Sequence, residues 1–187
     1  MLQHLKERLH QKHEEEGFTL IELMVVVLII AILLAIAIPT FLGARNTANA
    51  RAAQSNLRNA LTAEQTYYTN NNQQFGAGSQ MSSIEPNLQW QTAVSGLTTT
   101  GSTVFVDSTT IPDGVILVAE GADKNCYAIA QLNSAQGGAS AGTYYGAWPV
   151  GTGCTDPTAP SGSNTASGSA GGHIPASGGL TTWYTSF

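Results

Sequence analysis

One apolar stretch, residues 17–39, constrains the fold of this chain more than any other feature. It reads G-F-T-L-I-E-L-M-V-V-V-L-I-I-A-I-L-L-A-I-A-I-P, with 16 unbroken apolar residues from Leu23 to Ile38. As an α-helix, residues 18–38 would extend about 32 Å at ~1.5 Å per residue. That length matches a bilayer hydrocarbon core of ~30 Å. The stretch therefore predicts a membrane-spanning helix in which Glu22 is the single charged residue.

Three kinds of membrane segment could produce this pattern. A secretory signal peptide has an apolar region of about 7–15 residues and a small-residue cleavage site, whereas this run is longer and ends in I-P-T-F-L-G-A-R. In an ordinary single-span anchor, Glu22 would simply reach the membrane surface. In an assembly segment, Glu22 would be kept for a partner, since an ionisable group in a span is costly and points to function.

The motif G-F-T-L-I-E-L at 17–23, followed by the apolar run and Pro39, closely resembles the N-terminus of type IV prepilins. The resemblance continues to about residue 75 through A-A-Q-S-N-L-R-N-A-L-T-A-E-Q-T-Y-Y at 52–68. It implies an α+β fold, in which a long N-terminal helix packs on a small antiparallel β-sheet head domain. One half of that helix would span the membrane and the other half would be amphipathic.

The resemblance also implies processing at two residues. A prepilin peptidase would remove the leader, residues 1–17, by cutting between Gly17 and Phe18, and would then N-methylate the new amine of Phe18. Gly17 has no Cβ, so a protease can approach the backbone closely there. The leader departs from the usual basic pattern, because glutamates at 14–16 precede the cut.

Subunit assembly is assigned by the resemblance to Phe18 and Glu22. Glu22 would face the α-amine of Phe18 on a neighbouring subunit, because a lone carboxylate in apolar surroundings either takes up a proton or finds a cation. Desolvation offsets much of the attraction in such a pair. We therefore expect the pair to select the docking depth of the incoming subunit rather than to add net stability.

Pro39 and Gly43 form a weak point in the predicted helix. Proline removes a backbone hydrogen bond and kinks or loosens a helix at a cost of ~3 kcal/mol. In a plain anchor, Pro39 would mark the membrane exit. In a pilin it would separate the assembly helix, 18–39, from the amphipathic half, 40–68, and local melting there would let a filament stretch.

The remainder of the chain predicts the head, 69–154, and a C-terminal segment, 155–187. Helical spacing of apolar residues predicts a buried face on 40–68. Residues 69–100 would form a loop that apolar side chains hold on the domain. Runs at 103–107, 114–120 and 126–132, with a weaker one at 143–148, predict an antiparallel meander. Residues 155–179 have the composition of a flexible loop, and the β-prone end would return to the sheet. The residues behind these expectations are Ala50, Ala53, Leu57, Ala60, Leu61 and Tyr68 on the helix, Leu88, Trp90 and Val94 in the loop, and Trp183 or Phe187 at the end.

Cys126 and Cys154 are the only two cysteines. A chain exported past the membrane meets an oxidising compartment, where an even pair of cysteines favours a disulfide. Two free thiols are the alternative. In pilins, the matching feature is a C-terminal region bounded by a disulfide.

Composition excludes several functions. The net charge of −5 and the scattered basic residues predict no nucleic-acid surface. No phosphate loop, CxxC or HExxH sequence is present, so we expect neither an enzyme nor a cofactor or metal. A calcium site built from scattered aspartates is the one alternative, and its ligands would come from Asp107, Asp113, Asp123 and Asp156.

The sequence thus predicts a pilin that polymerises into an extracellular filament used for adhesion, surface motility or DNA uptake. Its expected partners are other copies of itself in a helical homopolymer, the prepilin peptidase and methyltransferase, the pilus assembly platform and motor, and the inner membrane before assembly. A pseudopilin of a type II secretion or competence system would share the same N-terminal motif. A monomeric membrane-anchored binding protein, with 69–187 as its ligand domain, is the rival from another class.

Overall fold

The computed structural model describes residues 17–99, 101–151, 153–170 and 179–187. A long helix, α2 (Leu20–Asn70), is followed by a short helix, α3 (Gly78–Met81), a 3-10 turn, η1 (Val94–Gly96), and seven strands. The chain divides into two compact units, with the boundary between Gly43 and Ala44. Helix α2 contributes its first part to one unit and its second part to the other. Of the predicted leader, only Gly17 lies within the described residues.

Helix α2 confirms the long helix predicted over 18–68, although it begins and ends two residues later. It contains 51 residues and continues through Pro39 and Gly43. Just after the proline, the Thr40 hydroxyl donates a hydrogen bond to the carbonyl oxygen of Ile36 at 3.1 Å. The helical backbone is therefore unbroken at the predicted weak point, and its melting under load stays a prediction.

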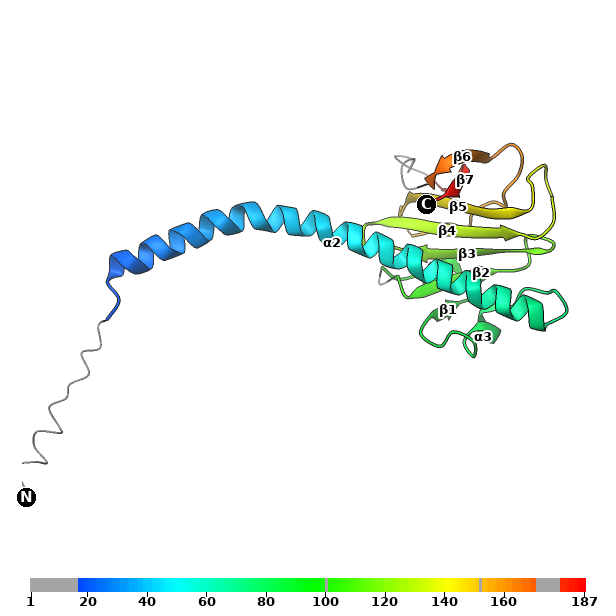
Figure 1. Cartoon of the computed structure of the whole chain (residues 1–187), viewed down its shortest axis with the longest axis horizontal. Helices are drawn as coiled ribbons and strands as arrows, with labels where there is room; N and C mark the ends of the chain where they lie inside the picture. The colour runs from blue at the N-terminus through cyan, green and yellow to red at the C-terminus, as the bar shows by residue number, and fades with distance from the viewer. Residues whose placement is uncertain (1–16, 100, 152, 171–178) are drawn as a thin grey trace, which may run out of the picture. The chain divides into compact units, whose positions relative to one another are not determined.

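The seven strands of the second unit form one sheet in the order β1-β2-β3-β4-β5-β7-β6 (Figure 1). Pairing is antiparallel from β2 to β7, whereas β1 is parallel to β2 and β6 is parallel to β7. The mostly antiparallel sheet confirms the predicted α+β class. The strands are β1 (Gln89–Gln91), β2 (Thr103–Asp107), β3 (Gly114–Glu120), β4 (Asn125–Leu132), β5 (Gly142–Pro149), β6 (Thr165–Ser169) and β7 (Trp183–Ser186).

The predicted meander corresponds to β2 through β5. Strands β2 and β3 have the predicted bounds, and β5 confirms the weaker fourth run with one additional residue at each end. The prediction of a flexible loop over 155–179 is wrong in part. Strand β6 lies inside it and pairs with β7 along the backbone. Its small side chains carry little strand propensity, and backbone pairing with a distant strand decides the structure there.

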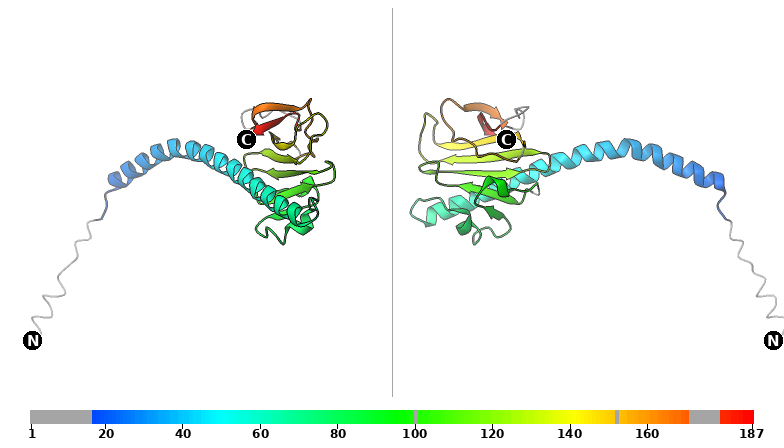
Figure 2. Two further views of the ribbon diagram at one scale, coloured as in Figure 1. Left: turned by 45° about the vertical axis from the view of Figure 1, so that its right-hand side comes forward. Right: turned by 180° about the vertical axis from the view of Figure 1, so that it is seen from behind.

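Both faces of the sheet are covered. The second half of α2 crosses one face, as Figure 2 also shows, and packs Leu57 into a cluster with Val104, Val115 and Leu117. On the other face, Leu180 and further side chains outside the strands cover the apolar residues that point away from α2. Burial on both faces explains why β3 and β4 have nearly continuous apolar sequences. The covering residues on that face include Val94, Leu97, Ile111 and Leu180.

The C-terminal segment returns to the sheet as predicted. Trp183 is fully buried, and its indole N–H donates to the carbonyl oxygen of Thr158 at 2.9 Å. The Phe187 ring packs edge-on against Tyr145 and Tyr127, with centroid distances of 4.8 and 5.8 Å. These contacts attach the end of the chain to the face of the sheet that α2 covers.

Cys126 and Cys154 form the predicted disulfide, with their Cα atoms 5.7 Å apart. Both residues are buried. The bond joins β4 to the segment that follows β5, and it closes a loop with a sequence separation of 28. The alternative of two free thiols is therefore excluded.

Replacing both cysteines by serine is expected to lower the free energy of unfolding of the head by about 3–4 kcal/mol, because the unfolded chain loses a loop constraint. Denaturant unfolding of the full chain in detergent micelles, followed by tryptophan fluorescence, measures the change. The three tryptophans, Trp90, Trp148 and Trp183, all lie in the second unit. Reductant should destabilise the native chain by a similar amount and leave the double variant unaffected. An unchanged unfolding midpoint in the variant would contradict the expectation.

Candidate functional site at the start of the long helix

The three residues before α2 form an open, non-helical entry to the helix. Gly17, Phe18 and Thr19 are not helical, and Phe18 is 87% exposed. A Cβ placed on Gly17 would meet no atom within 4 Å. The backbone around the predicted cut is therefore accessible to another protein, as a protease substrate requires.

Thr19 and Glu22 close the start of α2 with a reciprocal pair of hydrogen bonds. The backbone N–H and the hydroxyl of Thr19 donate to Glu22 Oε2 at 2.9 and 2.8 Å. The backbone N–H of Glu22 lies 3.3 Å from Thr19 Oγ1 and donates to it. This is the capping-box arrangement, which satisfies backbone donors that the first turn of a helix leaves unpaired.

The capping box gives Glu22 a role that the sequence analysis missed. The sequence Thr19-Leu-Ile-Glu22 has the S/T-x-x-E spacing that signals such a box, so the information was present. A carboxylate in the first turn also interacts favourably with the helix dipole. Glu22 is thus held at the same end of the helix as Phe18. The predicted contact with the Phe18 amine concerns a second copy of the chain and stays a prediction.

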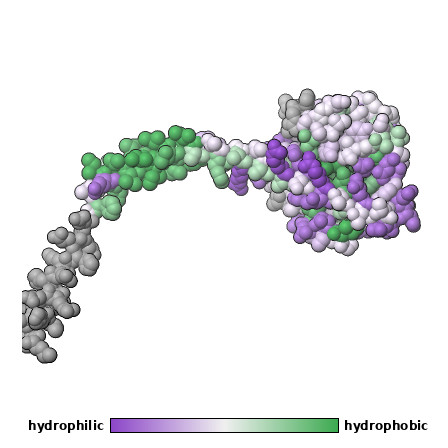
Figure 3. Space-filling model, in the orientation of Figure 1, coloured by the Kyte–Doolittle hydropathy of each residue, from purple (hydrophilic) through white to green (hydrophobic). Residues whose placement is uncertain are grey.

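The first unit exposes a nearly continuous apolar surface, which Figure 3 shows in green. By length and composition, α2 contains a segment that can cross a membrane, with a mean hydropathy of 3.3 over its most apolar 18 residues. Fully burying such a side chain is worth ~1.5–3 kcal/mol, so water is an unfavourable surrounding for this surface. The exposed side chains include Leu20, Ile21, Leu23, Met24, Val25, Val26, Val27, Leu28, Ile29, Ile30, Ile32, Leu33, Leu34, Ile36, Ile38, Phe41 and Leu42.

The four aspartates of the alternative calcium site do not come together. Asp113 accepts a hydrogen bond from the Tyr68 hydroxyl at 2.8 Å. Asp123 accepts from Tyr127 and Asn125 within its own hairpin. Within the described parts of the chain, no group of three or more His, Cys, Asp or Glu side chains could hold a metal ion.

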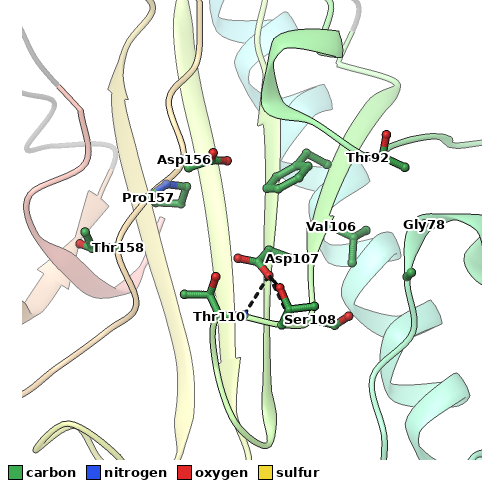
Figure 4. A pocket seen from close by; sticks show the side chains of 12 residues that line it. Gly78, Thr92, Val106, Asp107, Ser108, Thr110, Asp156, Pro157 and Thr158 are labelled. Atoms are coloured by element: carbon green, nitrogen blue, oxygen red, sulfur yellow. Dashed lines mark hydrogen bonds between the residues drawn. The ribbon is translucent and has the colours of Figure 1, made fainter.

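Asp107 and Asp156 do share an open cleft of about 600 Å³ in the second unit, shown in Figure 4. Asp107 Oδ1 accepts hydrogen bonds from the backbone N–H groups of Thr109 and Thr110 and from the Thr109 hydroxyl, at 2.8–3.0 Å. Partial burial raises the pKa of Asp107, but the bonds from Thr110 and Thr109 outweigh it and hold the pKa below its usual value. This carboxylate therefore stabilises the turn after β2.

Comparisons with known proteins agree with the N-terminal site. The profile of the prokaryotic N-terminal methylation motif matches residues 12–38. The type IV wide pilus major component PilA4 of Thermus thermophilus is 46% identical over 57 residues, which are 30% of this chain and 44% of that protein. The type IV major pilin protein PilA of Myxococcus xanthus is 47% identical over 53 residues, 28% of this chain and 24% of that protein. The matches thus span less than half the length of these relatives. No solved structure matches the chain.

Proposed function

Since this chain is a type IV pilin by its N-terminal methylation motif and its α+β fold, we propose that it is a structural subunit that polymerises into an extracellular pilus filament. The observation that carries the proposal is the joining of two features in one chain. An accessible Gly17–Phe18 bond lies just before an exposed apolar helix, and the same helix continues into a disulfide-bonded head. Filament subunits of this kind are structural proteins, not enzymes.

Before assembly, the helix from 18 to 39 would cross the cytoplasmic membrane once, with the head on the outer side. In the filament, the helices of neighbouring copies would cover the same apolar surface. Lipid tails and neighbouring helices are about equally apolar, so there is little hydrophobic gain in moving from one to the other. An assembly platform and motor would therefore supply the work, and polar contacts would decide where each subunit stops.

Glu22 and Phe18 would supply that polar contact. After removal of residues 1–17, the amine of Phe18 becomes the N-terminus of the mature chain and a cation. The carboxylate of Glu22 on a neighbouring copy is the complementary anion. Thr19 holds this carboxylate in place at the helix start, which supports its use as a fixed docking point.

N-terminal sequencing and intact-mass measurement of fibres sheared from cells test the proposal. We expect a chain that begins at N-methylated Phe18, which lacks residues 1–17. A Gly17→Val variant should keep its leader and be absent from the fibre fraction, because a β-branched side chain obstructs the approach of a protease to the backbone. A native chain that still begins at Met1 and is found only in membranes would contradict the proposal and favour a monomeric anchor.

The same fractions distinguish a pilus subunit from a pseudopilin. Abundant sheared surface fibres support the pilus, whereas a processed chain confined to the cell envelope with secretion proteins supports the pseudopilin. Both named relatives are pilus components, and this favours the pilus. Adhesion, motility or DNA uptake would then depend on the partners of the fibre.

A further inference from the structure

Glu64 places a carboxyl group in the interior of the head. It lies on the buried face of α2, four residues after Ala60 and seven after Leu57, and its side chain is 0% exposed. Apart from aromatic side chains, Thr103 is the only other buried polar side chain among the residues that the structure describes. Glutamate is almost never fully buried unless it is paired, so the surroundings of Glu64 require an explanation.

The hydrogen bonds of Glu64 are incomplete. Oε2 accepts the backbone N–H of Gly76 at 3.0 Å. Oε1 is also buried, and within the described part of the chain it has no hydrogen-bond partner. A neutral carboxyl group tolerates this position better than a carboxylate, because a buried charge without a compensating cation is far more costly than a buried dipole.

The titratable groups on the neighbouring elements do not compensate a charge on Glu64. The Arg58 guanidinium lies over the Phe187 ring, 5.5 Å from its centroid. Burial raises the pKa of Glu64 and the Gly76 hydrogen bond lowers it; burial prevails, and the pKa is raised to about 7. Within two turns of Glu64 on α2, the titratable side chains are Arg58, Tyr67 and Tyr68; beyond the helix, Glu85 follows α3, and Asp107 and Asp113 lie on either side of the β2–β3 turn.

The partner of Glu64 belongs to the connecting loop, which we define as residues 71–77 between α2 and α3. Asn72 and Gln73 both adopt left-handed backbone conformations, with φ of 53° and 60°. Such conformations are strained in residues other than glycine and persist only where surrounding contacts hold them. The Gly76 bond to Glu64 ties this strained loop to the buried face of the helix.

Gly76 also marks a close approach between the loop and its surroundings. A Cβ at this position would lie 2.5 Å from Met81 Cε and 3.2 Å from the Tyr67 ring. The loop backbone is therefore packed against both α2 and α3 at the point where it donates to Glu64. Water can reach the Glu64 carboxyl group if this packed segment moves away.

We propose that the protonation state of Glu64 controls how firmly the connecting loop is docked on the head. The neutral carboxyl group keeps Gly76 in place, and loss of its proton to solvent favours an open loop in which water hydrates the carboxylate. This inference does not depend on whether the chain forms a filament.

The sign of the pH dependence follows from linkage. The docked state holds the proton up to about pH 7, whereas a solvated glutamate has an ordinary pKa of 4.5. Docking is therefore strongest below about pH 4.5, weakens as the pH rises towards 7, and levels off above that value. The population of the open loop is expected to increase roughly 70-fold between pH 5 and pH 8.

Hydrogen exchange of the full chain in detergent micelles, measured between pH 5 and pH 8 and corrected for intrinsic exchange, tests the proposal. Peptides that cover the connecting loop and α3 should lose protection as the pH rises. In Glu64→Gln, which keeps an acceptor for Gly76 but cannot ionise, the loop should stay protected at pH 8. Glu85→Gln, a matched change of a half-exposed carboxylate, should behave like the native chain.

A loop whose protection does not change with pH in the native chain would overturn the proposal, as would an unchanged pH dependence in Glu64→Gln. Glu64→Met has a similar volume without an acceptor, and its loop should be open at every pH. Full protection of the loop in that variant would also overturn the proposal. Exchange in β3 and β4 reports whether each variant is folded. The pH dependence of loop exchange in the native chain tests the proposal even if no variant folds.

Discussion

Cells that produce the Glu22→Gln chain are expected to assemble almost no filaments, although the chain is processed and inserted normally. Glutamine keeps the size and the hydrogen-bonding oxygen of the side chain but removes the charge that would meet the Phe18 amine. Leaving one buried charge without its partner costs about 3–5 kcal/mol. At each subunit contact this corresponds to a factor of at least ~100 in the assembly equilibrium, so the amount of sheared fibre should fall by a similar factor.

Matched variants separate the assembly role of Glu22 from its role in the capping box. Thr19→Ala removes the hydroxyl that bonds Glu22 and should cost the helix about 1 kcal/mol, while leaving assembly largely intact. Glu22→Ala removes both roles and should resemble Glu22→Gln in fibre yield. If Thr19→Ala abolishes fibres while Glu22→Gln retains them, the capping box is the essential feature and the pairing with Phe18 is wrong.

Local patterns in the sequence were sufficient to predict most of the fold. The apolar run and the spacing from Ala53 to Ala60 predicted α2, because a helix is specified by residues close together in the chain. Strands β2 to β5 were predicted for the same reason, since hairpin partners are neighbours in sequence. The structure confirms these elements to within two residues at each end.

Elements that depend on distant partners escaped prediction. Strand β6 is composed of small residues and is defined by its pairing with β7. Strand β1 lies parallel to β2 across a connection that contains η1. Neither strand has alternating apolar residues. The covering of the second sheet face was indicated only by the uninterrupted apolar sequence of β3, which is typical of a strand buried on both sides.

Two features of the sites could have been found from spacing alone. Thr19 and Glu22 have the separation of a capping box. Glu64 continues the buried face of the helix from Leu57 and Ala60 at steps of three and four residues, so its position predicts burial even though its chemistry does not. Spacing could not reveal that the backbone N–H of Gly76 donates a hydrogen bond to this carboxyl group, because that contact depends on the path of the connecting loop.

Of the α2 residues that contact the sheet, Leu57 is expected to contribute most to the stability of the head. Its side chain is 0% exposed and packs with Val104, Val115 and Leu117. Leu57→Ala would leave a cavity in a close-packed interior, and such changes cost about 2–5 kcal/mol. Denaturant unfolding in micelles measures the loss, since tryptophan fluorescence reports the head alone.

Leu61→Ala is the matched control, because Leu61 lies one turn further along the same helix and is only half-buried. It makes the same chemical change and should cost about 1 kcal/mol, in proportion to the smaller apolar area it removes from contact. Equal losses in the two variants would contradict the packing described here. A larger loss at Leu57 would mean that the second half of α2 is an integral part of the head core. The head would then need this half of the helix to fold, and neighbouring copies could contact only its outer side.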